Sequence, residues 1–264
     1  MRAIILAAGR GSRLHPYTAN CPKCLTELGG QSLIARQLAT LRGAGVDDIV
    51  IATGYRREML ALPETRQVHN ALWDSTNMVE SLFCAEAGFG NDVIVTYADI
   101  VYEPRVLAAL LDSPHDVSVV VDRNWRAYWE HRFSDPLSDA ESLSMDSRGC
   151  IADIGNPVSD IDTIEAQYMG LMRFRGAGVD ALRAARANLD TVSRPWMEKR
   201  SVTNAYMTDL LMEMILMGRG LHAVPVEGGW LEIDTVEDYE RAAQMIADGS
   251  VIRFFDPATT PFSG

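Results

Sequence analysis

Short apolar segments rich in valine and isoleucine alternate with longer segments of helical character along the first half of the chain. Four of them stand out, at residues 3–8, 48–53, 92–98 and 116–121. None alternates apolar and polar residues, as a strand with one solvent-exposed face would. Strands buried on both faces lose that alternation, and parallel strands covered by helices are the usual case. The pattern therefore predicts an α/β fold with a largely parallel central sheet.

The residues between these segments show helical periodicity. Ile34, Leu38 and Leu41 stand four and three positions apart, so they share one face of a helix. The same spacing recurs late in the chain, at Tyr206, Leu210, Met214 and Met217. Residues 143–174 instead contain short strand-like pieces separated by turn residues, which predict antiparallel additions to the sheet. We expect a Rossmann-like, mixed but mostly parallel sheet flanked by helices.

The length and composition favour a single domain. A chain of 264 residues with 47% hydrophobic residues can bury one large α/β core. No internal repeat, low-complexity segment or linker marks a second domain. We expect one domain over residues 1–248, followed by a tail over residues 249–264 that packs loosely or against a partner.

The charge of the chain bears on its partners. A net charge of −12 repels phosphate backbones and anionic lipid, so we expect no nucleic-acid partner and no membrane partner. The apolar run at residues 3–8 is too short for a signal peptide, and no stretch approaches the roughly 18 apolar residues of a membrane span. We expect a cytoplasmic protein and leave open whether it is a homo-oligomer. Any phosphate ligand must be held by a local basic site.

The stretch LAAGRGSRLHPYTANCPKCL, residues 6–25, contains such a site. Gly9 and Gly11 follow the first predicted strand, where backbone N–H groups can approach an anion closely. Arg10, Arg13 and Lys23 gather in the same loop of an otherwise acidic protein. The spacing fits neither GxxxxGK[ST] nor GxGxxG, because a leucine stands at the position of the third glycine.

The pair Cys21 and Cys24 in this stretch has the spacing of a redox or zinc motif. A zinc site needs two further ligands at close spacing, and neither Cys84 nor Cys150 has a cysteine or histidine neighbour in the sequence. We therefore interpret Cys21 and Cys24 as ordinary loop cysteines on either side of a functional Pro-Lys pair.

Two aspartates have the position expected of metal ligands in an α/β sheet. Asp99 and Asp234 each follow an apolar strand-like piece, and ligands bind at the carboxyl ends of such strands. Mg²⁺ is commonly held by one or two carboxylates together with phosphate oxygens. Each aspartate is equally compatible with a helix N-cap, because Pro104 and Thr235 are expected to begin helices nearby.

The loop LAAGRGSRL followed by Pro-Lys resembles the signature of the sugar-nucleotide and related nucleotidyltransferases. The resemblance implies a nucleotidyltransferase fold that binds a nucleoside triphosphate. It implies that Gly9 and Gly11 lie beside the triphosphate, Arg13 on the leaving pyrophosphate and Lys23 near the attacked α-phosphate. It also implies that base and ribose lie against the backbone of three residues, Leu6, Ala7 and Ala8.

The same resemblance implies that Asp99 and Asp234 share a Mg²⁺ ion, with Glu232 as a helper. The family commonly has glycine before the first of these aspartates, whereas this chain has Ala98. Further segments, from residues 73–85 to the WLEIDT stretch, resemble the phosphocholine cytidylyltransferase-like branch, whose relatives also activate phosphonates such as 2-aminoethylphosphonate. This resemblance extends from residue 1 to about residue 245.

The branch implies CTP as the nucleotide, with Asn77 and Ser81 in contact with it. Both residues are almost as well explained as polar residues at the start of a helix. The acceptor is not decided by the sequence, since a quaternary ammonium would be recognised by aromatic faces and a primary amine by carboxylates. The candidates for acceptor binding are Trp129, Tyr168, Tyr206, Asp209, Trp230 and Glu232.

Trp125, Tyr128 and Trp129 form a dense aromatic group that could hold a quaternary ammonium or pack in the core. For a primary amine, Glu130 and Glu165 are further candidates beside Asp209. We expect a Mg²⁺-dependent cytidylyltransferase that transfers CMP from CTP to a small anionic acceptor and releases pyrophosphate. The acceptor would resemble phosphocholine or 2-aminoethylphosphonate. The alternatives are a sugar-1-phosphate nucleotidyltransferase and a non-catalytic nucleotide-binding regulatory protein.

Overall fold

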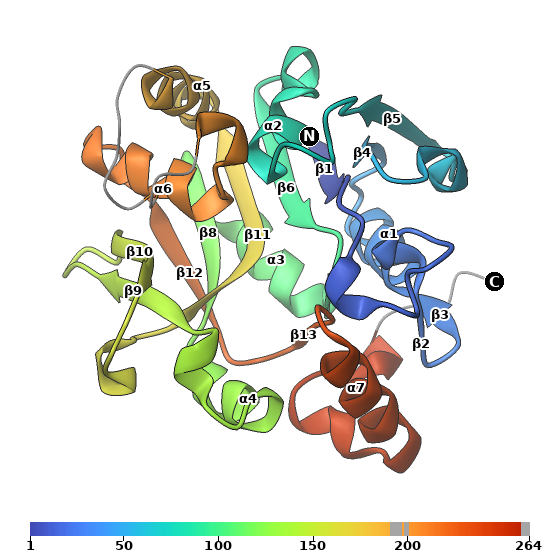
Figure 1. Ribbon diagram of the computed structural model, residues 1–264. Helices are drawn as coiled ribbons and strands as arrows, with labels where there is room; N and C mark the ends of the chain where they lie inside the picture. The colour runs from blue at the N-terminus through green and yellow to red at the C-terminus, as the bar shows by residue number, and fades with distance from the viewer. Residues whose placement is uncertain (191–196, 198–200, 260–264) are drawn as a thin grey trace.

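A computed structural model describes residues 1–190, 197 and 201–259 of the chain. Its centre is a seven-stranded sheet (Figure 1). In the order in which they lie side by side, the strands are β12 (His222–Val226), β8 (Val117–Asp122), β11 (Gln167–Arg175), β6 (Asp92–Tyr97), β1 (Arg2–Ala7), β4 (Asp48–Thr53) and β5 (Thr65–His69). All neighbours are parallel except β11, which runs antiparallel to both β6 and β8. The mixed, mostly parallel α/β sheet is confirmed.

Helices cover both faces of this sheet. They are α1 (Leu33–Gly43), α2 (Met78–Phe83), α3 (Pro104–Asp112), α4 (Trp125–Arg132), α5 (Ala177–Leu189), α6 (Met207–Leu216) and α7 (Val236–Asp248). Buried side chains of α1, α3, α4 and α7 belong to one hydrophobic cluster, and those of α2, α5 and α6 belong to another. Ala3 and Ile5 of β1 point into the first cluster and Ile4 into the second, because successive side chains of a strand face opposite ways.

The segment predicted as antiparallel additions divides into two parts. Only β11 joins the main sheet. β9 (Glu141–Met145) and β10 (Ile151–Pro157) pair with each other in a separate two-stranded sheet, so the prediction was wrong for them. Both strands leave many side chains exposed or half-exposed, and such strands suit a ribbon with one solvated face rather than a buried sheet.

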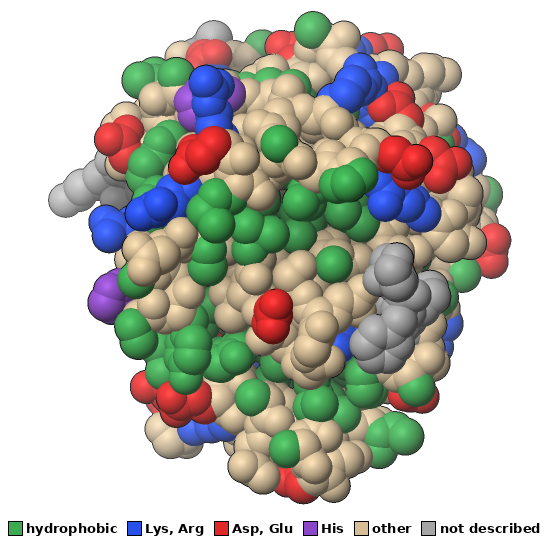
Figure 2. Space-filling view, turned by 90° about the vertical axis from the view of Figure 1, so that its right-hand side faces the viewer, with side chains coloured by type: hydrophobic (Ala, Val, Ile, Leu, Met, Phe, Trp, Pro, Cys, Tyr) green, Lys and Arg blue, Asp and Glu red, His purple; other side chains and the backbone are tan. Residues whose placement is uncertain are grey.

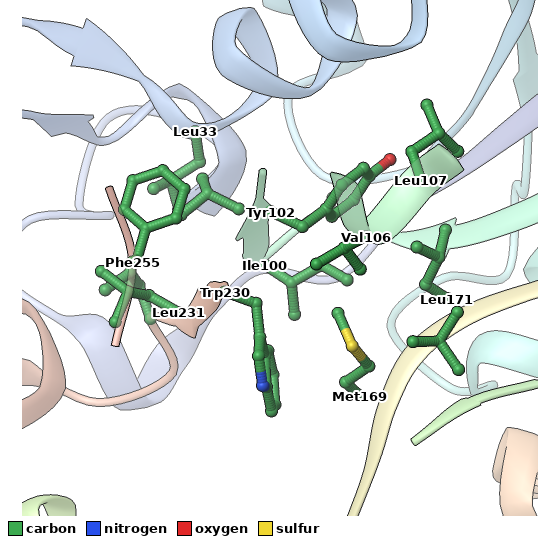
Figure 3. Packing of buried hydrophobic residues seen from close by; sticks show 14 of the residues in the cluster. Leu33, Ile100, Tyr102, Val106, Leu107, Met169, Leu171, Trp230, Leu231 and Phe255 are labelled. Atoms are coloured by element: carbon green, nitrogen blue, oxygen red, sulfur yellow. The ribbon is translucent and has the colours of Figure 1, made fainter. Parts of the chain in front are cut away.

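Two further short ribbons complete the fold. β2 (Glu27–Leu28) pairs with β3 (Gln31–Ser32), and β13 (Trp230–Glu232) pairs antiparallel with β7 (Ile100–Tyr102). The second ribbon sits on a tightly packed part of the core, where Trp230 lies on the side of Met169 of β11 and Leu231 lies beside Phe255 (Figure 3). Late residues of the chain are thereby fixed beside the end of β6.

The first part of the tail is packed, contrary to the expectation of loose packing. Phe255 is fully buried and lies beside Leu33 and Leu231 (Figure 3). The backbone carbonyl of Phe254 accepts a hydrogen bond from the Gly229 amide at 2.7 Å. Burying two phenylalanine side chains gives this segment a hydrophobic anchor that its glycine and proline content did not suggest. Residues 260–264 of the tail lie outside the described residues.

The surface mixes charges of both signs. Acidic and basic side chains are interspersed, with hydrophobic side chains between them, on the face shown in Figure 2. Among the residues that the structure describes, no helix has both the length and the apolar composition needed to cross a lipid bilayer.

Candidate active site

The opening loop leaves β1 and folds back across the end of the sheet. Gly11 adopts a φ of 68°, and a Cβ atom on it would lie only 2.7 Å from Cβ of Lys23. Any side chain at position 11 would collide with the side chain of Lys23, so this position requires glycine. Gly9 differs, because a Cβ on it would meet no protein atom within 4 Å. Leu14 is fully buried and anchors the far side of the loop.

Lys23 is the centre of a cluster of charges. Its ammonium nitrogen lies 2.7 Å from Oδ2 of Asp99 and 2.5 Å from Oδ1 of Asp234. The guanidinium of Arg13 lies 2.8 Å from the other oxygen of Asp234. Burial alone would lower the pKa of Lys23, but the two carboxylates outweigh burial and raise it. Two cations and two carboxylates therefore meet at one point of the fold.

The pairing of β7 with β13 explains why Asp99 and Asp234 meet. Glu232 is paired with Ile100, and the amide of Ile233 donates to the backbone carbonyl of Asp99 at 2.9 Å. Asp99 therefore immediately precedes β7, and Asp234 follows β13 by two residues, at the same end of the ribbon. Neither is a helix N-cap, since Glu103 and Thr235 occupy the N-cap positions of α3 and α7.

The two aspartates fit a divalent cation. Both approach the same nitrogen within 2.7 Å, and Oδ1 of Asp99 is buried without a hydrogen-bond partner. A buried carboxylate oxygen with no partner is costly, and a hard cation would satisfy it. Within the described ranges no third metal-ligating side chain joins them, which suits Mg²⁺ because that ion takes its other ligands from phosphate and water.

A buried arginine holds the segment that carries Asp234. Arg132 of α4 donates two hydrogen bonds to Asp238, at 2.9 and 3.1 Å, and one to Glu232 at 2.6 Å. Asp238 in turn accepts from the backbone amides of Asp234 and Thr235. The pKa values of the two carboxylates that Arg132 contacts are shifted in opposite directions. Despite its burial the pKa of Asp238 is lowered, whereas burial and neighbouring carboxylates raise the pKa of Glu232 to about 7.

A cavity of about 430 Å³ opens beside this cluster. The structure brings together here most of the residues predicted for the nucleotide, the phosphates and the metal, namely Leu6, Ala7, Ala8, Gly9, Gly11, Arg13, Lys23, Asn77, Ser81, Asp99 and Asp234. Glu232, the expected helper at the metal, lines a neighbouring cavity instead, and Arg10 lines neither cavity. Asn77 also caps α2, because its Oδ1 accepts from the Met78 amide at 2.8 Å. The roles of these residues remain predictions.

Sequence reasoning missed other residues of this cavity. Trp73 and Thr76 line it beside Asn77 and Ser81, and they belong to the same segment between β5 and α2. The family resemblance of residues 73–85 was the signal that could have identified them. Cys24 also lines the wall, and burial raises the pKa of its thiol to about 12, so it is an inert wall residue.

A second cavity of about 300 Å³ adjoins the first. The two share Arg13, Met78, Tyr97, Tyr206 and Asp234 among their lining residues. The second cavity is rich in carboxylates. Those that line it are Asp139, Glu141, Glu232 and Asp234. Asp139 and Glu141 were not singled out in the sequence, where the acidic segment after α4 was the available signal.

The aromatic candidates divide between cavity and core. Tyr168, Trp129 and Trp230 line the second cavity, whereas Trp125 and Tyr128 are buried outside it. Two of these rings already contact a cation. The guanidinium carbon of Arg132 lies 5.1 Å from the ring centroid of Trp129 and 5.4 Å from that of Tyr128.

Three acidic candidates are not brought to either cavity. Asp209 accepts a hydrogen bond from the Tyr206 amide at 2.7 Å and caps the start of α6. Glu130 is exposed and pairs with Arg126 one helical turn away. Glu165 is exposed and accepts from the Met145 amide at 3.1 Å. Local capping and pairing account for these three positions, and their assignment to the acceptor remains a prediction.

Comparison with known proteins places this geometry in a family. Residues 3–189 match the model of the MobA-like NTP transferase domain. The chain is 36% identical over 252 residues to the CTP:phosphoglutamine cytidylyltransferase of Campylobacter jejuni, a match that covers 91% of this chain and 98% of that relative. The chain is also 34% identical over 134 residues to the CMP-5'-(3-aminopropyl)phosphonate synthase of Streptomyces rubellomurinus. This match covers 48% of this chain and 21% of that relative.

A solved structure has the same fold. The CTP:phosphocholine cytidylyltransferase of Streptococcus pneumoniae superimposes with a TM-score of 0.70 over 93% of this chain and 98% of that one. The two sequences are 21% identical, so this likeness bears on architecture alone.

Proposed function

The chain belongs to the family of MobA-like NTP transferase domains, and from that premise we propose that it transfers CMP from CTP to a small phosphorylated or phosphonate acceptor that carries an amine. CTP as the donor is supported by the relatives that act on it or form CMP products. The observation that carries the proposal is the junction of the two cavities, where Lys23 lies between Asp99 and Asp234 and Arg13 contacts Asp234.

In the proposed reaction an anionic oxygen of the acceptor attacks the α-phosphorus of CTP. A phosphorus–oxygen bond forms as the bond to the bridging oxygen of the β-phosphate breaks, and its electron pair leaves with pyrophosphate. No general base is required, because the attacking oxygen already carries the charge. Lys23 and Arg13 exchange carboxylate partners for phosphate oxygens, and their contribution is orientation and charge neutralisation.

Asp99 and Asp234 are the residues that would hold Mg²⁺, which when bound supplies further neutralisation of the phosphate oxygens. The carboxylate pair has a second role in this chain. It keeps Lys23 charged and centred, so that the ammonium is in place before a nucleotide arrives.

A primary ammonium suits the second cavity better than a quaternary one. Asp139, Glu141 and Glu232 line it and can accept hydrogen bonds, which a primary ammonium donates and a quaternary one cannot. The aromatic faces of Tyr128 and Trp129 are already engaged by Arg132. Phosphoglutamine and aminoalkylphosphonates, which the names of two relatives contain, both carry an amine.

The test is pyrophosphate release with CTP, UTP, ATP and GTP against phosphoglutamine, 2-aminoethylphosphonate, phosphocholine and glucose 1-phosphate. We expect the highest kcat/KM with CTP and an acceptor that bears a primary amine. A preference for glucose 1-phosphate would favour a sugar-1-phosphate nucleotidyltransferase. Absence of pyrophosphate release with every pair, in a protein that still binds CTP, would favour a non-catalytic regulatory protein.

A further inference from the structure

The first cavity has a charged end and a neutral end. Lys23, Asp99 and Asp234 gather at the charged end. The other end is lined by uncharged side chains, those of Trp73, Thr76 and Asn77 from the segment between β5 and α2, and that of Ser81 from α2. A nucleoside triphosphate has its phosphates at one end and its base at the other, so we expect the base of a bound nucleotide to face these neutral side chains.

Asn70, which the sequence did not single out, organises that segment from behind. It follows β5 directly and is 3% exposed. Its Oδ1 accepts a hydrogen bond from the Leu72 amide at 2.9 Å. Because that bond fixes which side of the amide is oxygen, the Nδ2 group must face the other way. It donates to Oγ1 of Thr76 at 2.9 Å and to Oγ of Ser81 at 3.0 Å.

These bonds fix the direction in which each hydroxyl can donate. Thr76 accepts from Asn70 and gives its proton to the backbone carbonyl of Leu72 at 2.7 Å. Ser81 also accepts from Asn70, but the carbonyl that faces its proton, that of Asn77, lies at 3.5 Å, the outer limit of a hydrogen bond. Ser81 is therefore a hydroxyl that lines the cavity and has a proton to give.

The direction of that donation matters for the choice of base. N3 of cytosine is a hydrogen-bond acceptor, whereas N3 of uracil carries a proton and is a donor. We propose that Asn70 is a positioning residue that fixes Ser81 as a hydrogen-bond donor to N3 of the base, and that this contact selects CTP over UTP. With UTP, N3–H would need the remaining lone pair of the Ser81 oxygen, and the Ser81 proton would be left with only the 3.5 Å contact to the Asn77 carbonyl. The inference rests on the proposed function and adds the origin of its nucleotide specificity.

The substitution Asn70→Asp replaces the amide donor that faces Ser81 by an acceptor oxygen, with almost no change in the shape of the side chain. The carboxylate still accepts from Leu72, but its second oxygen replaces the amide donor and must accept the proton of Ser81. The Ser81 oxygen is then an acceptor toward the cavity, which suits N3–H of uracil. We expect the ratio of kcat/KM for CTP to that for UTP to fall by about 10-fold to 100-fold, the effect of one mismatched buried hydrogen bond.

The experiment measures kcat/KM for both nucleotides in the wild type, Asn70→Asp, Ser81→Ala and the double variant. We expect kcat/KM for UTP to rise in Asn70→Asp, whereas mere loosening of the site would lower both values. We expect the double variant to have the ratio of Ser81→Ala, since the effect of Asn70 passes through Ser81. Thermal unfolding shows whether Asn70→Asp is folded.

Ser81→Ala supplies an independent test if Asn70→Asp does not fold. It should lower kcat/KM for CTP and leave that for UTP unchanged or higher. Equal losses for both nucleotides in either folded variant would overturn the inference and leave the proposed function standing. A wild-type enzyme that does not prefer CTP to UTP would overturn both.

Discussion

The two cavities meet at Arg13 and Asp234, yet they are built in different ways. Most of the first is formed by two short continuous stretches, residues 6–24 and 73–81, with Asp99 and Asp234 added by one strand pairing. The second draws its walls from many widely separated segments between residues 13 and 234. Residues of one continuous stretch are close in space because they are close in the sequence. A wall assembled from many segments exists only in the folded protein.

The cations of the two regions show the same contrast. Lys23 lies between two carboxylates at the edge of the first cavity, where a phosphate can compete for it. Arg132 is held by Glu232 and Asp238 and covered by aromatic rings, and its side chain is 3% exposed. The first cation can change partners during a reaction, whereas the second is fixed in the framework.

The largest expected effect comes from Asp99→Asn, which tests whether the first cavity works through its carboxylates. We expect turnover to fall by about 10³-fold, because the variant loses a ligand for the metal and a partner of Lys23. Pyrophosphate release would be measured across a Mg²⁺ titration and after chelation with EDTA. Asp112→Asn, an exposed carboxylate of α3, is the matched control and should behave as wild type. Unchanged Mg²⁺ dependence in Asp99→Asn would contradict the assignment.

Lys23→Ala tests the exchangeable cation. We expect kcat to fall by about 10²-fold, the effect of losing one preorganised donor to the charge that develops in the transition state. Removing the ammonium also leaves Asp99 and Asp234 facing each other, so thermal unfolding should be recorded beside the kinetics. Arg219→Ala removes an exposed cation that lines neither cavity and serves as the control. Activity near that of the wild type would remove Lys23 from the mechanism.

The contrast also explains how far the sequence could predict the molecule. The buried strands were readable because β1, β4, β6 and β8 each form one short apolar run, and their bounds differ from the predicted ones by at most one residue at either end. The opening loop was readable because its glycines and cations follow one another. The meeting of Asp99 with Asp234 was implied by family resemblance, and its physical cause is the pairing of β7 with β13.

The second cavity could not be predicted in the same way. Trp125, Tyr128 and Trp129 stand at helical spacing on one face of α4, and that spacing favours burial over ligand binding. Arg132 stands four and three positions after Tyr128 and Trp129, so helical spacing places it beside their rings, but the sequence did not indicate that its charge would be buried there. Its role depends on Glu232 and Asp238, which are brought to α4 only by the packing of the C-terminal segments.

Two glycines of the first cavity allow the effect of a side chain on stability to be measured apart from its effect on nucleotide binding. Gly11→Ala places a Cβ against Lys23 at a φ of 68°, so we expect it to lower the free energy of unfolding by about 1–2 kcal/mol. Gly9→Ala meets no protein atom, and we expect unchanged stability with weaker CTP binding. Chemical denaturation and calorimetric titration with CTP measure the two effects. Equal losses of stability in both variants would contradict this division.

The smallest expected effect tests the second cavity, through Glu232→Gln. Glu232 is partly exposed, and an ion pair with an acceptor ammonium at such a position contributes up to about 1 kcal/mol, or about fivefold in KM. Phosphoethanolamine and ethyl phosphate differ only in the amine, so they form a matched pair of acceptors. We expect KM for phosphoethanolamine to rise about fivefold in the variant, with KM for ethyl phosphate and for CTP unchanged. A rise that is equal for both acceptors would mean that Glu232 acts through Arg132 and the position of Asp234. In that case Glu232 would support the carboxylates of the first cavity, and the second cavity would not recognise the amine of the acceptor through this residue.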